Sequence, residues 1–276
     1  LDLQYADQDA SMMADALHLA GSALFADGDS LEVYCLSTAK TQQDRPKHPK
    51  VQWSSSSKSN IEQVFQEIRR SAKAEDIVVV YLSGHGVTYG GANETQFYYL
   101  TQDISNEGEL GDPGTLKKFT ISSEELTGWI NAIPALKQVL ILDACNSGQI
   151  INNITGSTKR LNSSQIRALD RMKDRTGLFV LAGSASDKVS YEAGQYGQGL
   201  LTYALLKNMR GVDARSNDVD VMEWFQYARN EVPRLAKSIN GIQTPMLGFP
   251  SHGASFDIGI RSEEVKANIP IGNEKP

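Results

Sequence analysis

Two runs of apolar residues, IVVVYL at 77–82 and QVLILD at 138–143, constrain the fold more than any other feature of this sequence. Both are rich in β-branched residues and almost free of polar positions, as strands buried on both faces of a parallel sheet are. Further strands are predicted at 31–36, 97–100, 178–183 and 255–260. Because stretches of helical period separate them, the sequence predicts an α/β fold with a mostly parallel central sheet flanked by helices.

Helices are predicted at 9–25, 199–210 and 220–237. Two more begin at recognisable caps, because Ser59 is followed by Glu62 and Ser122 by Glu125 at the spacing of a capping box. The stretch SSSSKS at 54–59 has the composition of a flexible connector.

The charge balance narrows the class of partner. The chain has 27 Lys and Arg against 33 Asp and Glu, a net charge of −6, whereas nucleic-acid binding needs a basic surface, so no nucleic-acid partner is expected. No run of 18 apolar residues occurs, so no membrane-spanning helix or membrane partner is expected. Two distant cysteines, Cys35 and Cys145, and four histidines predict neither a disulfide scaffold nor a zinc site and favour a cytoplasmic location.

Unusual residues follow both apolar runs. The first leads into SGHG, which places His85 between two glycines on a predicted tight turn, and the second leads into ACNSG with Cys145. Reactive groups collect beyond the carboxyl ends of parallel strands, so His85 and Cys145 face each other if the strands are neighbours. A free thiol is only about 3 % thiolate at neutral pH, and an adjacent imidazole activates it. The amides of Gly86 and Cys145 are candidates for holding an oxyanion.

The sequence also allows other roles for Cys145 and His85. A single Cys after a strand is usually a small core residue, and a single His in a loop is usually solvated. A cysteine phosphatase is disfavoured because the position of its phosphate-binding Arg holds Ile151, and a serine hydrolase because Ser147 is not within GxSxG. No nucleotide-binding glycine motif is present.

The two segments VVVYLSGHG (78–86) and VLILDACNSG (139–148) together resemble the caspase and metacaspase superfamily of cysteine peptidases. Further segments resemble the same family: FYYLTQDI at 97–104, GLLTYALLKNMRG at 199–211 and QTPMLGFPSHGASFDIGI at 243–260. The resemblance implies a caspase-like three-layer sandwich formed by residues 1–260 as one domain, with a first strand upstream of Leu1 and a polar tail or linker at 261–276.

The resemblance also assigns roles in catalysis and specificity. His85 matches the general base and acid, and Cys145 the nucleophile. Metacaspases cut after Arg or Lys and carry two pocket carboxylates, whose positions match Asp143 and Asp9 here. Two carboxylates in a cleft suit one guanidinium independently of the resemblance, but Asp7 or Asp9 could instead cap the first helix and Asp143 a loop.

Further substrate contacts follow from the same comparison. Ser83 matches a pocket-lining position, and the loop from Ser184 to Tyr191 is expected to pair with the substrate as an added strand. Glu192 stands where caspases have an Arg that binds the substrate Asp, so an Asp-specific enzyme is disfavoured.

Family members are often activated by cleavage after the nucleophile strand, a place that residues 148–176 occupy. Six Lys and Arg stand against two Asp between 159 and 175, and the candidate self-cleavage sites are Lys159, Arg160 and Arg175. A solvated basic helix is the alternative.

No cofactor is required by this reading. Calcium dependence, found in many metacaspases, is left open, because no EF-hand type cluster occurs and only Asp103, Glu124 and Glu125 are candidates.

The sequence therefore predicts a cysteine endopeptidase whose substrates are proteins or peptides with Arg or Lys before the cleaved bond. The chain is expected to be fused to or associated with other domains. The alternative is a caspase-like module that binds partners without catalysis.

Overall fold

The computed structural model describes residues 5–25, 31–89, 96–104, 107–146, 178–183, 195–250 and 254–272. The chain divides into two compact units. The first unit consists of Leu1–Leu3, Ser55–Asp187 and Gly248–Gly253, and the second of Gln4–Ser54, Lys188–Leu247 and Ala254–Pro276.

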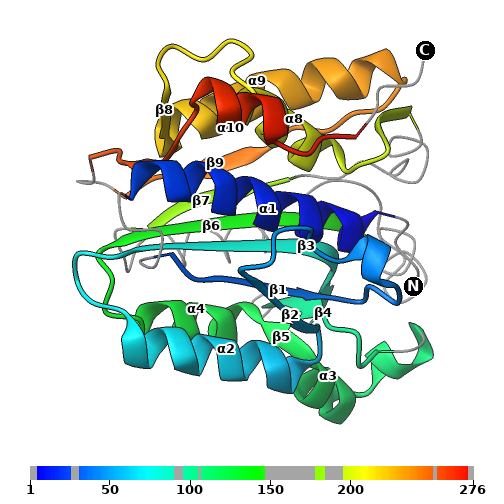
Figure 1. The fold of residues 1–276 in the computed structure, drawn as a ribbon. Helices are drawn as coiled ribbons and strands as arrows, with labels where there is room; N and C mark the ends of the chain where they lie inside the picture. The colour runs from blue at the N-terminus through cyan, green and yellow to red at the C-terminus, as the bar shows by residue number, and fades with distance from the viewer. Residues whose placement is uncertain are drawn as a thin grey trace. The chain divides into compact units, whose positions relative to one another are not determined.

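The first unit is built on a sheet with the strand order β5-β4-β3-β6-β7 (Figure 1). Strands β3 (Ile77–Tyr89), β6 (Lys137–Asn146) and β7 (Leu178–Ala182) are parallel to one another. At one side, β4 (Gln96–Leu100) pairs antiparallel with β3, and β5 (Thr120–Ser122) pairs antiparallel with β4. The predicted α/β class with parallel central strands is confirmed.

Burial differs between the two apolar strands. Val139, Leu140 and Ile141 of β6 are each at most 1 % exposed, so this strand is covered on both faces as predicted. Residues 77–81 of β3 are only half-buried. The reason lies in the pairing, since β4 lies beside β3 only along 86–89, and among the described strands β6 alone pairs with the earlier part.

Helices α2 (Lys58–Ser71) and α4 (Ser123–Asn131) lie side by side in the first unit (Figure 1). The apolar stripe of α2 buries Ile61 and Phe65, one turn apart, and the Phe65 ring packs at 5.3 Å from that of Trp129 on α4. The short helix α3 (Pro113–Phe119) precedes β5.

The two predicted helix caps had different outcomes. The box of Ser122 and Glu125 is confirmed, because the Glu125 amide donates to Ser122 Oγ at 3.1 Å and the Ser122 amide to Glu125 Oε2 at 2.9 Å. The cap at Ser59 is wrong, since α2 begins at Lys58 and its cap is Ser57.

A long-range contact explains this shift. The Lys58 amide donates to Asp103 Oδ2 at 2.8 Å, so a carboxylate 45 residues away accepts from the first amide of α2. The expected connector at 54–59 is also wrong in extent, because β2 (Val51–Ser55) occupies its start and α2 its end.

The second unit begins with α1 (Ala6–Leu24), which buries Met13, Ala16 and Ala20. A two-stranded sheet of β1 (Val33–Ser37) and β2 follows. The loop between these strands is held to α1 by side chains of that helix. Ser11 Oγ donates to the Asp44 carbonyl at 2.6 Å, and the Asp15 carboxylate accepts from the amides of Lys47 and His48 at 2.9 and 3.0 Å.

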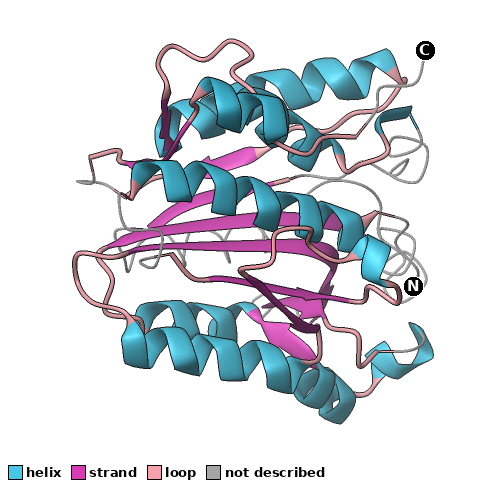
Figure 2. Cartoon of the chain, in the orientation of Figure 1, coloured by secondary structure: helices cyan, strands magenta, loops and turns pink. Residues whose placement is uncertain are grey.

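The rest of the second unit packs around α8 (Leu200–Met209) and α9 (Val221–Ser238), which lie side by side (Figures 1 and 2). All residues of α8 except Lys207 are buried. Trp224 of α9 is fully buried and its indole N–H donates to the Leu205 carbonyl at 2.9 Å. Strands β8 (Asp218–Asp220) and β10 (Asp257–Ile260) pair antiparallel, and β9 (Met246–Gly248) lies where the chain passes from the second unit to the first.

The segment expected to be a polar tail contains α10 (Glu263–Asn268) and buried residues. Ile269 is fully buried, and its carbonyl accepts from Arg210 Nε at 2.9 Å. Arg261 is also fully buried, and its guanidinium donates to Asn208 Oδ1 at 2.8 Å and to the carbonyls of Ser216 and Asp218. None of the described helices combines the length and the apolar character that crossing a membrane requires.

A stacked pair of histidines joins α1 to the loop after β1. The rings of His18 and His48 lie 3.7 Å apart between centroids, and His18 is 4 % exposed. Burial lowers the pKa of His18, and the charges of His48 and Lys50 lower it further, against the opposing effect of Asp15. The folded chain therefore favours the neutral imidazole at position 18.

We expect this histidine to make the second unit acid-sensitive. An unfolded His has a pKa of about 6.5, so the unfolded chain binds the proton first as pH falls, and stability present above that pH is progressively lost below it. Urea unfolding of wild type and His18→Leu at pH 7.5 and 5.5 measures this. The variant should lose less free energy of unfolding between the two pH values, and equal losses would contradict the assignment.

Candidate active site

The parallel pairing of β3 with β6 brings four predicted site positions together. It runs without interruption from Ile77 opposite Lys137 to Gly86 opposite Asn146. Within it, Ser83 pairs with Asp143 and His85 with Cys145. Because alternate residues of a strand belong to opposite faces, positions 83, 85, 143 and 145 share one face of the sheet. Positions 143 and 145 are among the last four residues of β6, at its carboxyl end, and positions 83 and 85 of β3 pair with them.

The flanking glycines suggested that His85 lies on a tight turn, and this prediction is wrong. Strand β3 continues through it to Tyr89 and pairs with β4 from Gly86 onward. His85 is half-buried and Asp143 is 6 % exposed. Asp143 lies within β6, three residues before the end of the strand.

The two glycines beside His85 make room for aromatic side chains of β4. A Cβ at Gly84 would lie 2.7 Å from Tyr99 Oη and 2.9 Å from its Cε2, and a Cβ at Gly86 would overlap the Phe97 ring. The Tyr99 hydroxyl also donates to the Ser83 carbonyl at 2.8 Å. Close packing therefore requires glycine at both positions, and the oxyanion role of the Gly86 amide stays a prediction.

Sequence reasoning missed this contact between β3 and β4. A signal was present, because the glycines at 84 and 86 and the aromatic residues Phe97 and Tyr99 both alternate with the two-residue period of a strand. The register between the strands, which pairs Gly86 with Tyr99, could not be read from the sequence.

Asp9, the second predicted pocket carboxylate, belongs to the second unit. It is 3 % exposed, and its carboxylate accepts from the Gly199 amide with oxygen–nitrogen distances of 3.0 and 3.3 Å. Gly199 is the N-cap of α8, so Asp9 binds the amino end of that helix, where a negative charge is favoured. The helix that contains Asp9 has Tyr5 as its N-cap and no side-chain cap.

Several predicted positions lie outside the described residues. They are the substrate-loop residues Ser184, Tyr191 and Glu192, and the candidate self-cleavage residues Lys159, Arg160 and Arg175.

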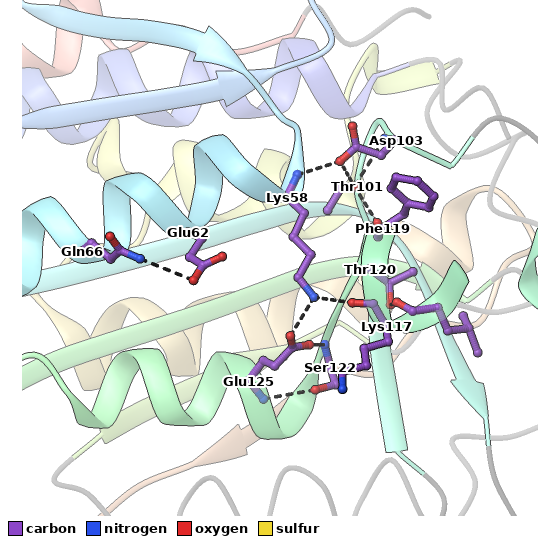
Figure 3. Close-up of polar contacts among 11 residues, drawn as sticks. Lys58, Glu62, Gln66, Thr101, Asp103, Lys117, Phe119, Thr120, Ser122 and Glu125 are labelled. Atoms are coloured by element: carbon purple, nitrogen blue, oxygen red, sulfur yellow. Dashed lines mark hydrogen bonds and ion pairs between the residues drawn. The ribbon is translucent and has the colours of Figure 1, made fainter. Parts of the chain in front are cut away.

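Two of the three calcium candidates take part in a hydrogen-bond network around Lys58 (Figure 3). Lys58 Nζ lies 2.6 Å from Glu125 Oε1 and donates to the Lys117 carbonyl at 2.7 Å. Asp103 Oδ2 accepts from the Lys58 amide and, at 3.1 Å, from Thr101 Oγ1. The network ties the start of α2 to the end of β4 and to α3 and α4.

The network also sets the charge state of Glu125. Burial acts to raise the pKa of this carboxyl, but the hydrogen bonds from Lys58 and Ser122 and the charge of Lys58 outweigh it and lower the pKa. Both carboxylate oxygens of Glu125 and Oδ2 of Asp103 thus already accept hydrogen bonds from protein donors. In the described ranges, no three His, Cys, Asp or Glu side chains are grouped so as to hold a metal ion.

The mixed sheet with its parallel central strands agrees with the caspase-like sandwich that the resemblance implies. The family model of the caspase domain matches residues 1–253. The chain therefore belongs to the caspase domain family, a family of peptidases. The matched range extends over both compact units, and α10 follows it.

The comparisons with curated proteins and with solved structures give no match and a distant match, respectively. No curated protein matches the chain. Among solved structures, the crystal structure of protein GSU0716 from Geobacter sulfurreducens is similar, with a TM-score of 0.45 and 12 % sequence identity over 74 % of this chain and 78 % of that chain.

The packing around Gly86 predicts a large stability effect. Gly86→Ala should lower the free energy of unfolding by about 1–3 kcal/mol, because the added methyl group displaces the Phe97 ring. Gly128→Ala is the matched control, since nothing lies within 4 Å of a Cβ built there. Within α4 it should stabilise by about 0.5–1 kcal/mol. Urea unfolding of both variants measures this, and a Gly86→Ala variant as stable as wild type would contradict the packing.

Proposed function

We propose that this protein is a cysteine endopeptidase that cleaves after Arg or Lys. The observation that carries the proposal is the register of β3 and β6, which pairs position 85 with position 145 and position 83 with position 143. One pair has the residue types of a proton acceptor and a nucleophile. The other adds a buried carboxylate two residues before the nucleophile.

The proposed reaction uses His85 twice. The imidazole takes the proton of the Cys145 thiol, and the thiolate attacks the carbonyl carbon of the substrate. The amides of Gly86 and Cys145 hold the resulting oxyanion. When the C–N bond breaks, His85 gives its proton to the leaving amine. His85 then takes a proton from water, which hydrolyses the acyl-enzyme and releases the acid and the thiol.

Asp143 is the group that we propose selects a basic side chain. A buried carboxylate gains most from a partner cation, and a guanidinium matches it through two parallel hydrogen bonds. Ser83, paired with Asp143, is a further contact on the same two strands. By the family resemblance, the loop from Ser184 to Tyr191 binds the substrate backbone and Glu192 disfavours an Asp in the substrate, while the role of Asp9 stays a prediction.

A panel of fluorogenic peptides tests the specificity. Peptides with Arg, Lys or Asp before the cleaved bond are offered with and without calcium to wild type, Cys145→Ala, His85→Ala and Asp143→Asn. The first two variants should lose at least about 1,000-fold in kcat. Asp143→Asn should lose about 100-fold in kcat/KM for Arg and Lys peptides, as truncation of one partner of a buried charge pair does.

Asp213→Asn is the matched control for charge. Asp213 is exposed and has a φ of 54°, a conformation that Asn adopts readily, so its replacement removes one carboxylate without strain. Cleavage after Asp alone would refute the assignment of Asp143. If folded wild type cleaves none of the peptides, the alternative of a non-catalytic caspase-like module that binds partners is favoured.

Self-cleavage within 148–176 is a separate proposal, supported by the excess of Lys and Arg there. Incubated wild type should yield two fragments on a denaturing gel, whereas Cys145→Ala should stay intact. Joint replacement of Lys159, Arg160 and Arg175 by Gln should abolish the cut while leaving peptide cleavage measurable. The same gel pattern for wild type and Cys145→Ala would reject self-cleavage.

A further inference from the structure

Tyr99 contacts the backbone of β3 from the face opposite to His85. It is 8 % exposed, and its hydroxyl donates to the Ser83 carbonyl at 2.8 Å. Its register partner is Gly86, the residue directly after His85. One side chain thus spans the backbone from two residues before His85 to one residue after it.

The same side chain fills the space above Gly84. The distances of 2.7 and 2.9 Å from a built Cβ to Tyr99 Oη and Cε2 leave room for a hydrogen atom only, and Phe97 fills the equivalent space at Gly86. Burial raises the pKa of Tyr99, so the hydroxyl keeps its proton and remains a donor across the neutral range.

The contact between Tyr99 and β3 matters because Gly84 and Gly86 flank His85. Glycine is the most conformationally free residue, and here it stands on both sides of the imidazole that must move a proton. A proton acceptor has to stay within hydrogen-bond reach of the thiol, about 2.6–3.2 Å, for transfer to be efficient. Strand β6 pairs with Gly84, His85 and Gly86, and the contact from Tyr99 adds a second restraint on this segment.

We propose that Tyr99 is a positioning residue for His85, whose ring and hydroxyl hold the backbone of 83–86 and so keep the imidazole aligned with Cys145. This inference rests on the proposed function. Tyr99 touches neither the substrate nor the reacting atoms, so its effect reaches the reaction through His85.

The test compares two single-atom deletions, one beside His85 and one in the second unit. Tyr99→Phe removes the hydroxyl that binds Ser83, and Tyr34→Phe removes a hydroxyl that donates to Glu32 Oε2 in the second unit. With an Arg peptide, Tyr99→Phe should lower kcat about tenfold and leave KM within twofold, and Tyr34→Phe should change neither. A loss of the same size in both variants, or an unchanged kcat in Tyr99→Phe, would overturn the proposal.

A second readout does not depend on peptide cleavage. The rate at which iodoacetamide alkylates Cys145, followed by mass spectrometry against pH, reports how strongly His85 favours the thiolate. Cys35 does not interfere, because it is buried and burial raises its pKa to about 12. In Tyr99→Phe the alkylation profile should move toward that of a free thiol, as in His85→Ala, while Tyr34→Phe keeps the wild-type profile.

These readouts separate the two hypotheses. If wild type cleaves no peptide but the alkylation profile shifts in Tyr99→Phe, the peptidase proposal fails and the positioning role stands. If wild type cleaves the peptides and Tyr99→Phe matches it in both kcat and alkylation, only the positioning role fails. Gly84→Ala, which displaces the Tyr99 ring and keeps its hydroxyl, should shift the alkylation profile in the same direction, and an unshifted profile in a folded Gly84→Ala variant also contradicts the role.

Discussion

The pairing of β3 with β6 is the contact on which both the core and the candidate site of the first unit depend. Ten consecutive residue pairs join the two strands, from Ile77 with Lys137 to Gly86 with Asn146. The earlier pairs bury apolar residues of β6, and the later pairs bring His85 and Cys145 into register. A slip of one residue would move each strand's side chains to the wrong face relative to its partner, so burial of β6 and alignment of the site are enforced together.

The first unit supports the end of β3 from two sides. Strand β6 lies along one edge of it, and β4 begins to pair along the other at Gly86. The far end of β4 is in turn held by Asp103 and Thr101, whose hydrogen bonds connect it with the start of α2 and with Phe119 at the end of α3. Gly84 and Gly86, which give the backbone of β3 conformational freedom, are therefore packed against a strand that hydrogen bonds hold in place.

Much of this arrangement could be predicted from the sequence, for physical reasons that also explain the failures. The apolar strands, the amphipathic helices and the Ser122 cap are local patterns, and each was predicted near its observed place. The start of α2 at Lys58, the aromatic cover on the glycines and the contact of Asp9 with Gly199 depend on residues distant in the chain. The sequence predicted that His85 and Cys145 face each other only if their strands are neighbours. Strand order and register depend on contacts between distant parts of the chain, and the structure supplies both.

The buried guanidinium of Arg261 bears on where this domain ends. The family match stops at residue 253, yet Arg261 lies beyond it and supplies donors to Asn208 and to two backbone carbonyls in the second unit. A shortened chain that follows the family boundary would deprive the buried Asn208 side chain of this donor. The α10 segment and Ile269, which follow directly, would lose their places as well. The physical boundary of the domain therefore lies farther toward the carboxyl terminus than sequence similarity alone would draw it.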